Sequence, residues 1–393
     1  MAAGGAAPSL AEVDIRTSIR PTVATIDLGA VQRNVLRLRE MVGPGVAIWS
    51  VIKADAYGHG AVAVARALES LSNALAVSLV EEGLELRAAG VRAPIVVLGA
   101  AFNRHHNQVL DERLTPVVYD PADLDRFAAA ASKRGKPAAI HIKVDTGMSR
   151  LGVSTAELPD LLDRVGNLPS LTLAGLCTHF ASADMPDSAA TDEALARFAP
   201  CLDLVARRWP GTLTNHAANT AAAVRFPKTR LDAIRPGLAL YGTVPSPHVS
   251  VPGLEPALRL STRIMAVHEI QPGTTVSYGG LWRASRPSRV ATLPLGYADG
   301  YPRHVRGAQV LVKGTRVPVV GAVCMDMFMI DVTDVPGSAV GDPVTLIGLD
   351  GTERITVEDL AGWAGTVSYE ILCGISKRVP RVYLNISITP PPP

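Results

Sequence analysis

The stretch Val46-Ala-Ile-Trp-Ser-Val-Ile-Lys-Ala-Asp-Ala-Tyr-Gly-His-Gly60 joins an apolar run to a polar, glycine-containing turn. A short apolar run rich in β-branched and aromatic residues predicts a buried strand over residues 46–52. Lys53 stands where that strand ends. Seven more apolar runs of similar length follow along the chain, at residues 74–80, 95–98, 115–119, 138–144, 171–177, 212–216 and 231–234.

Amphipathic segments, such as residues 61–71, 81–89 and 192–208, separate these runs. Repeated alternation of strand and helix predicts a parallel sheet with helices outside it. Eight such units favour an α/β fold of the (β/α)8 type, a TIM-like barrel. An open doubly wound sheet is the alternative, but no G-x-G-x-x-G motif follows the first strand.

The pattern changes at the proline-rich connector over residues 246–256. Beyond it, short β-branched runs separated by Gly and Pro predict a mostly-β C-terminal domain. Those runs are residues 261–270, 289–295, 309–312, 317–324, 327–332 and 343–347, and only residues 355–364 and 368–374 have a helical pattern. We therefore expect an N-terminal extension over residues 1–19, a barrel over 20–252 and a β-rich domain over 253–393.

Composition limits the possible function classes. Of the 393 residues, 48% are hydrophobic and 19% charged, which is typical of a globular protein with a large core. The net charge of +2 gives no electrostatic case for nucleic acid or an anionic membrane as a partner. The four cysteines fit no zinc spacing, and we expect no metal. No apolar stretch is long enough for a signal peptide or a membrane helix, so we expect a cytoplasmic protein.

Charged and polar residues recur where the predicted barrel strands end. In a barrel these ends converge at one face, where active sites lie. Each residue also has an ordinary explanation, since a terminal lysine is commonly a surface residue and a lone histidine a satisfied core residue. The recurrence at successive strand ends favours a site instead, in which a desolvated lysine attacks an aldehyde and an arginine holds a carboxylate. The residues at these strand ends are Lys53, Lys143, His179, His216 and Arg235, and Arg150, the candidate for the carboxylate, follows the fifth run.

Several blocks of this sequence resemble the alanine racemase family. The segment Lys53-Ala-Asp-Ala-Tyr-Gly-His-Gly60 resembles the family's pyridoxal-phosphate attachment signature. Further blocks follow in the family's order, from about Arg20 to Tyr383. They are residues 143–152, 178–184, 216–220, 235–242, 277–279, 296–303, 324–326 and 369–373.

The resemblance implies a pyridoxal 5'-phosphate enzyme that interconverts L-alanine and D-alanine and so supplies D-alanine for peptidoglycan. It also implies a head-to-tail homodimer, in which the β domain of one subunit completes the barrel mouth of the other. The substrate implied for the enzyme is a small-molecule amino acid.

The resemblance further implies a role for each site residue. Lys53 holds the cofactor and is the base for D-alanine, whereas Tyr278 of the partner is the base for L-alanine. Arg150 and the partner's Met325 bind the substrate carboxylate. Arg235 faces the pyridine nitrogen, and His179 bridges Arg235 and Tyr278, with His216 behind. The cofactor is also held by Tyr57, Asn219, Thr220, Gly237, Leu238 and Tyr369, and the site is supported by Lys143, Tyr297 and Asp326. Tyr297 and Tyr369 narrow the entrance.

The chemistry accounts for these residue types. Racemisation needs a base on each face of the substrate, and one lysine serves only one face. Ionising a tyrosine of pKa about 10 at pH 7 costs about 4 kcal/mol, which a hydrogen-bonded cationic network can offset. Arg235 cannot accept a proton, so a pyridine nitrogen facing it makes a weaker electron sink than one facing a carboxylate.

Some alternatives stay open at this stage. Small cofactor-carrier proteins share the barrel and its lysine but lack a second domain, and barrel decarboxylases would place an acidic residue where Arg235 stands. A racemase of broader specificity, acting on serine, lysine or arginine, is the closer alternative. The resemblance suggests a carbamate on Lys143, and a plain lysine is the other possibility.

Overall fold

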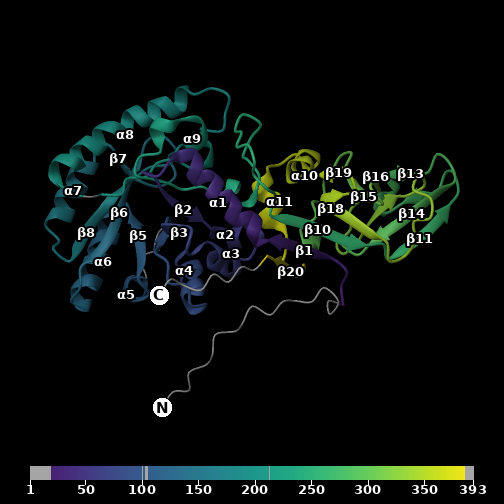
Figure 1. Cartoon of the computed structure of the whole chain (residues 1–393), viewed down its shortest axis with the longest axis horizontal. Coiled ribbons are helices and arrows are strands. Elements are labelled where there is room, and N and C mark those ends of the chain that lie inside the picture. Colours follow the sequence, from purple (N-terminus) through teal and green to yellow (C-terminus); the bar gives the residue numbers. More distant parts are fainter. Residues whose placement is uncertain (1–18, 100, 102–104, 212, 386–393) are drawn as a thin grey trace, which may run out of the picture.

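The computed structural model describes residues 19–99, 101, 105–211 and 213–385. The predicted extension over residues 1–19 therefore lies outside the described residues except for Ile19. Figure 1 shows two parts side by side, a barrel wrapped in helices and a second part built mostly of strands. This is the predicted α/β barrel followed by a mostly-β domain.

The barrel is a ring of parallel strands. Strand β9 pairs with β2, and His216 bridges Cys177 of β8 on one side and Ala233 of β9 on the other, which closes the ring. Its strands are β2 (Ala47–Val51), β3 (Ala74–Val77), β4 (Ile95–Val97), β5 (Leu114–Val118), β6 (Ala138–Asp145), β8 (Leu171–Cys177) and β9 (Ala233–Ile234). The predicted strand over 212–216 is reduced to the bridge at His216, and Thr212 lies outside the described residues.

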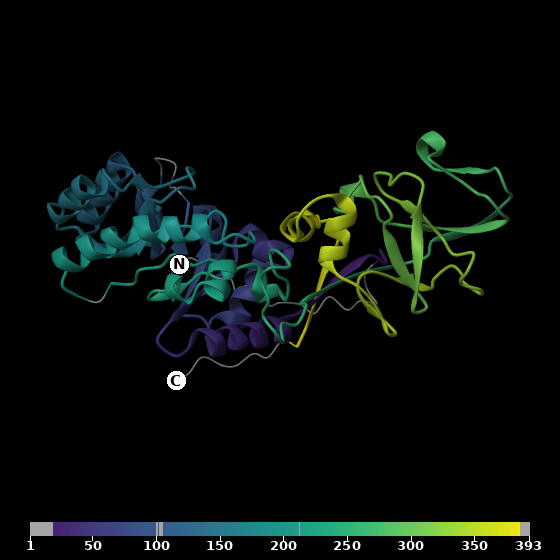
Figure 2. The same cartoon turned by 90° about the horizontal axis from the view of Figure 1, so that it is seen from above.

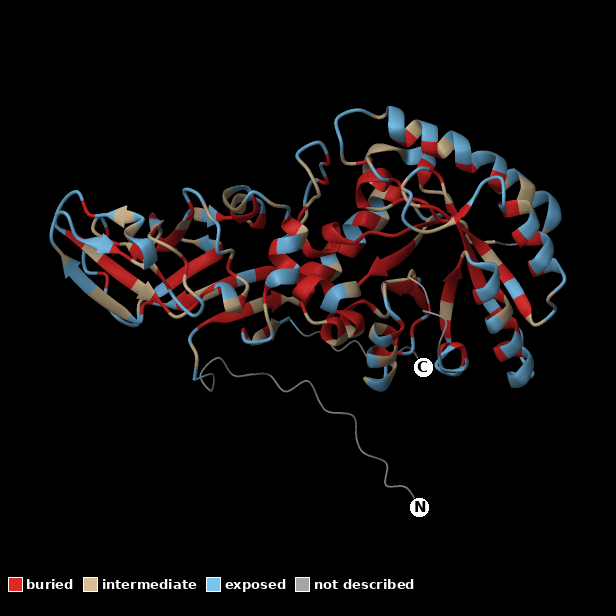
Figure 3. Cartoon of the chain, turned by 180° about the vertical axis from the view of Figure 1, so that it is seen from behind, coloured by how far each residue is buried: buried red, intermediate tan, exposed pale blue. Residues whose placement is uncertain are grey.

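Helices cover the outside of the ring (Figure 1). They are α1 (Leu28–Val42), α3 (Ala61–Leu68), α4 (Val80–Ala88), α5 (His106–Asp111), α6 (Pro121–Arg134), α7 (Leu158–Gly166), α8 (Ala189–Arg208) and α9 (Thr220–Arg225). Helix α6 shows why they form. Asp120 caps its first turn by accepting a hydrogen bond from Ala122, and Pro121 occupies the position where no N–H is needed. Figure 3 shows buried residues on the inner faces and exposed residues on the outer faces.

The second part is a large, mainly antiparallel sheet in the order β11-β14-β17-β16-β15-β18-β10-β1-β20. Its strands are β1 (Val23–Asp27), β10 (Leu258–Arg263), β11 (Ala266–Ile270), β14 (Ser288–Leu293), β15 (Gln309–Val312), β16 (Thr315–Val320), β17 (Phe328–Asp331), β18 (Pro343–Asp350) and β20 (Arg381–Leu384), with β19 (Glu353–Ile355) beside β18. A small hairpin of β12 (Thr275–Val276) and β13 (Trp282–Arg283) stands apart. Both helices predicted here are present, as α10 (Val357–Ala364) and α11 (Ser368–Gly374).

Strand β1 differs from the sequence-based expectation, which assigned residues from 20 onward to the barrel. It lies in the second sheet, antiparallel to β10 and parallel to β20. Its alternating burial is visible in sequence, but alternation does not say which distant strand is the partner. The predicted boundary near residue 252 stays a prediction.

Helix α11 joins the two parts. Figure 2 shows α10 and α11 between the barrel and the sheet. A Cβ built on Gly58, in the turn after β2, would lie 2.2 Å from the carbonyl oxygen of Leu372 in α11. This close approach brings Tyr369, which is also on α11, to the mouth of the barrel. Within the described residues, no helix is both long and apolar enough to cross a membrane.

Candidate active site

A cavity of about 410 Å³ opens where the barrel strands end, a size in the usual range for small-molecule sites. Eleven of the residues predicted from the sequence line this cavity: Lys53, Tyr57, Lys143, Arg150, His179, Asn219, Thr220, Arg235, Gly237, Leu238 and Tyr369. His216 lies behind the wall, in contact with Arg235. The barrel thus gathers residues that are far apart in sequence, at the face where such enzymes carry their sites.

The cavity is strongly cationic. Two lysines and two arginines line it, namely Lys53, Lys143, Arg150 and Arg235, and no acidic residue is among the described residues of its lining. Such a site favours a ligand with more than one negative group, such as a phosphate together with a carboxylate.

Lys53 follows β2 and is half-buried. Burial lowers the pKa of its ammonium group, and the charge of Arg150 lowers that pKa further, while Glu82 opposes the change. A larger fraction of the amine is therefore neutral at a given pH than for an exposed lysine. A neutral amine is the form that attacks an aldehyde.

The turn after Lys53 has an unusual backbone. Residues Ala54, Asp55, Ala56 and Tyr57 all have φ of 52–53°, which makes a single left-handed turn. This conformation costs non-glycine residues roughly 1–2 kcal/mol each, so surrounding contacts must hold it. His59 supplies two such contacts, since its Nδ1 lies 3.0 Å from the carbonyl oxygens of Ala56 and Tyr57.

Arg235 is buried and aligns the histidines around it. Its guanidinium lies 2.5 Å from Nδ1 of His216 and 3.4 Å from Nδ1 of His179, and it donates to the carbonyl oxygens of Thr178 and Ala217. Arginine can only donate hydrogen bonds, so both Nδ1 atoms must accept and both histidines carry their proton on Nε2. Burial and the charge of Arg235 hold the pKa of each histidine well below its usual range.

The hydrogen-bond chain continues beneath the cavity. Nε2 of His216 lies 3.3 Å from Nδ1 of His141, so the proton on His216 points toward His141. Burial lowers the pKa of His141 to about 4, which keeps this acceptor neutral. Trp49 packs against both rings. His141 was not predicted from the sequence, although it lies two residues before Lys143 on the same face of β6, a spacing that could have indicated it.

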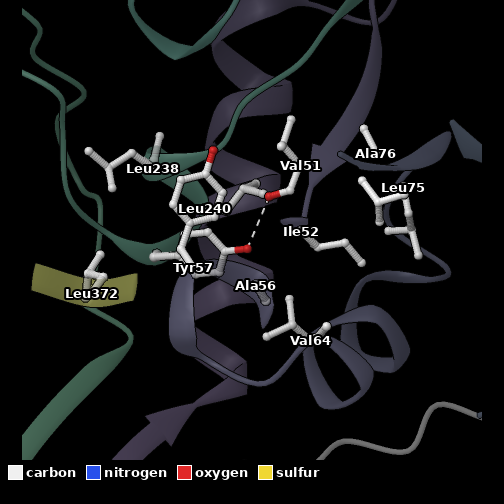
Figure 4. Packing of buried hydrophobic residues seen from close by; sticks show 14 of the residues in the cluster. Val51, Ile52, Ala56, Tyr57, Val64, Leu75, Ala76, Leu238, Leu240 and Leu372 are labelled. Carbon is white, nitrogen blue, oxygen red and sulfur yellow. Dashed lines mark hydrogen bonds between the residues drawn. The ribbon is translucent and has the colours of Figure 1, made fainter. Parts of the chain in front are cut away.

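The other end of the cavity has hydroxyl groups and closely packed backbone. Gly237 donates to the hydroxyl of Thr220 at 3.1 Å, and a Cβ on Gly237 would lie 2.5 Å from the hydroxyl of Tyr57. Tyr57 packs 5.9 Å from Tyr369, between ring centroids. Figure 4 shows Tyr57 with Leu238 and with Leu372 of α11. Asn219 caps α9 through Ala222 and so fixes Thr220.

Four predicted site residues lie outside this cavity. Tyr278 and Met325 are 75% and 54% exposed, and Tyr297 is also exposed. Asp326 makes an ion pair with Arg378 at 2.7 Å. None of the four is among the described residues that line the Lys53 cavity of their own chain.

The fold and cavity define a class of protein: a barrel enzyme that presents a lysine amine within a cationic pocket, as pyridoxal-phosphate chemistry requires. The model of the alanine racemase N-terminal domain matches residues 26–245, and that of the C-terminal domain matches residues 257–383. The chain belongs to the alanine racemase family.

Relatives and solved structures agree with this assignment. An alanine racemase from Halothermothrix orenii is 44% identical over 369 residues, covering 93% of this chain and 97% of the relative. The structure of alanine racemase from Streptomyces coelicolor A3(2) matches with a TM-score of 0.90 and 35% identity, covering 95% of this chain and all of that one. Alanine racemase from Bacillus anthracis with bound L-Ala-P matches with a TM-score of 0.87 and 37% identity, covering 94% and 96%.

Alanine racemases are pyridoxal 5'-phosphate enzymes, and the residues of this cavity fit that cofactor. Lys53 offers an amine of lowered pKa. Gly237 lies against the hydroxyl groups of Tyr57 and Thr220, and its lack of a side chain leaves backbone and hydroxyl donors close together, as a phosphate site needs. The excess of cationic groups matches a phosphorylated ligand.

Proposed function

We propose that this protein interconverts L-alanine and D-alanine, with pyridoxal 5'-phosphate bound at Lys53. The observation that carries the proposal is the position of Lys53, a half-buried lysine of lowered pKa in the cationic cavity of an alanine racemase barrel. When bound, the cofactor withdraws electrons from the α-carbon of its amino acid and so makes the α-proton removable. The remaining chemistry belongs to the side chains around it.

Two bases on opposite faces move the proton. Lys53 takes or returns it at Nζ on the D-alanine face, and Tyr278 of the partner subunit does so at its hydroxyl on the L-alanine face. His179 supports the tyrosine, because its neutral ring keeps an N–H at Nε2 that can donate to a phenolate. Arg235, held by His216, supplies the positive charge behind that bond.

The substrate and cofactor are held by the rest of the set. Arg150, with Met325 of the partner subunit, would bind the substrate carboxylate, and Arg235 would hold the ring nitrogen of the cofactor. Tyr297 and Tyr369 are proposed to narrow the entrance, and Asp326 is proposed as a supporting residue of the site. The residues that would hold the phosphate are Tyr57, Thr220, Gly237, Leu238 and Tyr369, and Asn219 would also help to bind the cofactor.

Lys143 is proposed to carry a carbamate that orients Arg150. Burial lowers the pKa of its ammonium group, and the charges of Arg235 and Arg150 lower it further, while Cys177 opposes the change. A lower pKa leaves a larger fraction of the amine neutral, and the neutral amine is the form that reacts with carbon dioxide. A carbamate would also place an anion among the cations of the cavity.

The functional unit is proposed to be a homodimer with shared sites. The support is the exposure of Tyr278 and Met325 away from the cavity of their own chain. Mechanistically, a lysine alone leaves one face of the substrate without a base. A second copy of the chain is the simplest source of the missing tyrosine.

The product D-alanine is proposed to supply peptidoglycan synthesis in the cytoplasm. The support for a reducing compartment is that all four cysteines are free. A racemase of broader specificity is the competing function. The relatives from Halothermothrix orenii and Sorangium cellulosum, both named alanine racemase, favour alanine.

The experiment is an assay of several L-amino acids for D product, with and without added pyridoxal phosphate. Alanine is expected to turn over fastest, and the Lys53→Ala variant is expected to lose both turnover and the visible absorbance of the bound cofactor. Faster turnover of lysine or arginine than of alanine would contradict the substrate assignment. Persistence of the visible band in Lys53→Ala would contradict the role of Lys53.

A further inference from the structure

Glu82 of α4 connects the ends of two barrel strands. One of its carboxylate oxygens accepts a hydrogen bond from the backbone N–H of Ala54 at 2.6 Å. The other accepts from the N–H groups of Ser78 and Leu79, at 2.7 and 2.9 Å. Ala54 follows β2 and Lys53, whereas Ser78 follows β3, so one side chain fixes both loops at the mouth of the barrel.

This arrangement requires a carboxylate. Both oxygens accept, and their three partners are backbone donors that cannot reverse their role. A glutamine has the same shape but only one accepting oxygen, so its NH₂ group would face an N–H on one side. An aspartate keeps the charge but is one methylene shorter.

The bond to Ala54 bears directly on Lys53. The N–H of Ala54 belongs to the peptide plane that joins Lys53 to Ala54, so fixing that N–H fixes the orientation of the plane. Fixing that plane restrains the backbone at Lys53 and so the direction in which its Cα–Cβ bond leaves the chain. Ala54 is also the first residue of the left-handed turn, whose later carbonyl groups are held by His59.

Capping of α4 explains only part of the geometry. Glu82 is the third helical residue and bonds back to Leu79, as in an ordinary capping arrangement. That arrangement uses one oxygen. The second oxygen reaches a residue 28 positions earlier in the chain, next to Lys53.

We propose that Glu82 is a positioning residue for Lys53. Glu82 holds the start of the left-handed turn and so directs the lysine side chain into the cavity. The inference deepens the proposed function and rests on the role assigned there to Lys53. Glu82 does not line the cavity, so it acts through the backbone rather than on the substrate.

The test compares Glu82→Gln and Glu82→Asp with two controls in the full-length holoenzyme. Glu81→Gln removes the same charge from the exposed neighbouring position. Asn73→Ala removes a side chain that accepts from Ile48, near the opposite end of β2, and so controls for loss of stability in the same strand. The measurements are thermal midpoint, the dissociation constant of pyridoxal phosphate, and the visible circular dichroism per bound cofactor.

Both Glu82 variants are expected to weaken cofactor binding at least tenfold and to change the circular dichroism, while both controls stay within twofold of wild type. If both Glu82 variants lower only the thermal midpoint and leave binding and dichroism within twofold, Glu82 merely caps α4 and the proposal fails. If Glu82→Asp alone binds as wild type, the charge matters rather than the reach, and the positioning role is overturned.

Hydrogen exchange in the wild-type protein provides a test that needs no variant. The Ala54 amide is expected to exchange at least tenfold more slowly than in an unstructured peptide, although the residue is exposed. Exchange at the unprotected rate would overturn the proposal. The Lys53→Ala absorbance experiment separates this failure from failure of the proposed function, because it tests the lysine without altering Glu82.

Discussion

The guanidinium of Arg235 sets the protonation of the residues around it. Because it can only donate, it makes Nδ1 an acceptor in both His216 and His179, and the proton of His216 then points to His141. The permanent charge of Arg235 thus determines which nitrogen carries the proton in His216 and His179, and through His216 it orients the hydrogen bond to His141. The proposed phenolate of the partner's Tyr278 would complete this set through His179.

Replacing His216 with Phe should destabilise the protein by about 2–3 kcal/mol, because a buried charged donor loses its acceptor. Urea unfolding of the variant measures this directly. The exposed His248→Phe serves as the control and should change stability little. Equal stability of the His216 and His248 variants would show that Arg235 does not depend on this bond.

Stability should fall as the pH drops from about 6.5 toward 4. Burial lowers the pKa of His59 and of His141 to about 4, so in this window the unfolded chain binds protons that the folded protein excludes. The stabilising contribution is fully present above pH 6.5 and is lost as the pH falls through the folded-state pKa. Each histidine contributes up to about 1.4 kcal/mol per pH unit there.

The measurement is the free energy of unfolding from urea titrations at several pH values. His141→Gln should have a shallower slope between pH 6 and 4.5 than wild type, whereas the exposed His248→Gln should not. Parallel curves for His141→Gln and wild type would rule out the buried neutral state of His141.

At the residue scale, the sequence was informative wherever a residue type and a strand end coincide. Lys53, Lys143 and Arg235 were predicted on that basis, and all line the cavity. Glu82 could not be predicted, because its partner Ala54 follows a different strand and their meeting depends on how the barrel closes. The roles assigned to the site residues stay predictions.

Among the elements, the left-handed turn between β2 and α3 joins the lysine to the second domain. Gly58 closes the turn at φ +80°, against the backbone of α11. Gly58→Ala should therefore be strongly destabilising and should also weaken cofactor binding, because α11 carries Tyr369.

Gly90→Ala provides a matched control for this prediction. Gly90 has φ of +84°, but a Cβ there would meet nothing within 4 Å. It should cost only the conformational penalty of about 1–2 kcal/mol, with unchanged cofactor affinity. Equal effects of the two variants, by thermal denaturation and cofactor titration, would mean that contact with α11 is unimportant.

The elements also show which features local patterns reveal. Helix α11 matches the predicted range, because its apolar spacing lies within one segment. The strand predicted over 212–216 survives only as the bridge at His216, whose neighbours Cys177 and Ala233 are far away in sequence. Pairing of this kind is decided by ring closure and not by the local run.

For the whole molecule, subunit mixing tests whether sites are shared. Lys53→Ala and Tyr278→Phe are each expected to be inactive, but a mixed dimer would hold one site with both wild-type residues. In a randomised equimolar mixture, about half of the dimers contain one chain of each variant. Each of these mixed dimers has one intact site of its two, so about a quarter of wild-type activity should return.

The control is a mixture of two differently tagged Lys53→Ala chains, which should regain nothing, and mass spectrometry of the tags verifies exchange in both mixtures. Absence of recovery after verified exchange would mean that each chain uses its own tyrosine, and the shared-site dimer would be wrong.

Strand β1 has a consequence for how the protein is made. It lies between β10 and β20, and Asp27 bonds to Asn385, 358 residues later. At roughly 5–20 residues per second, the ribosome needs about 20–70 s to deliver that last strand after the first has emerged. One edge of β1 can pair with β10 earlier, but the other edge has no partner until β20 has been made. The second sheet therefore cannot close on both sides of β1 until β20 has been synthesised.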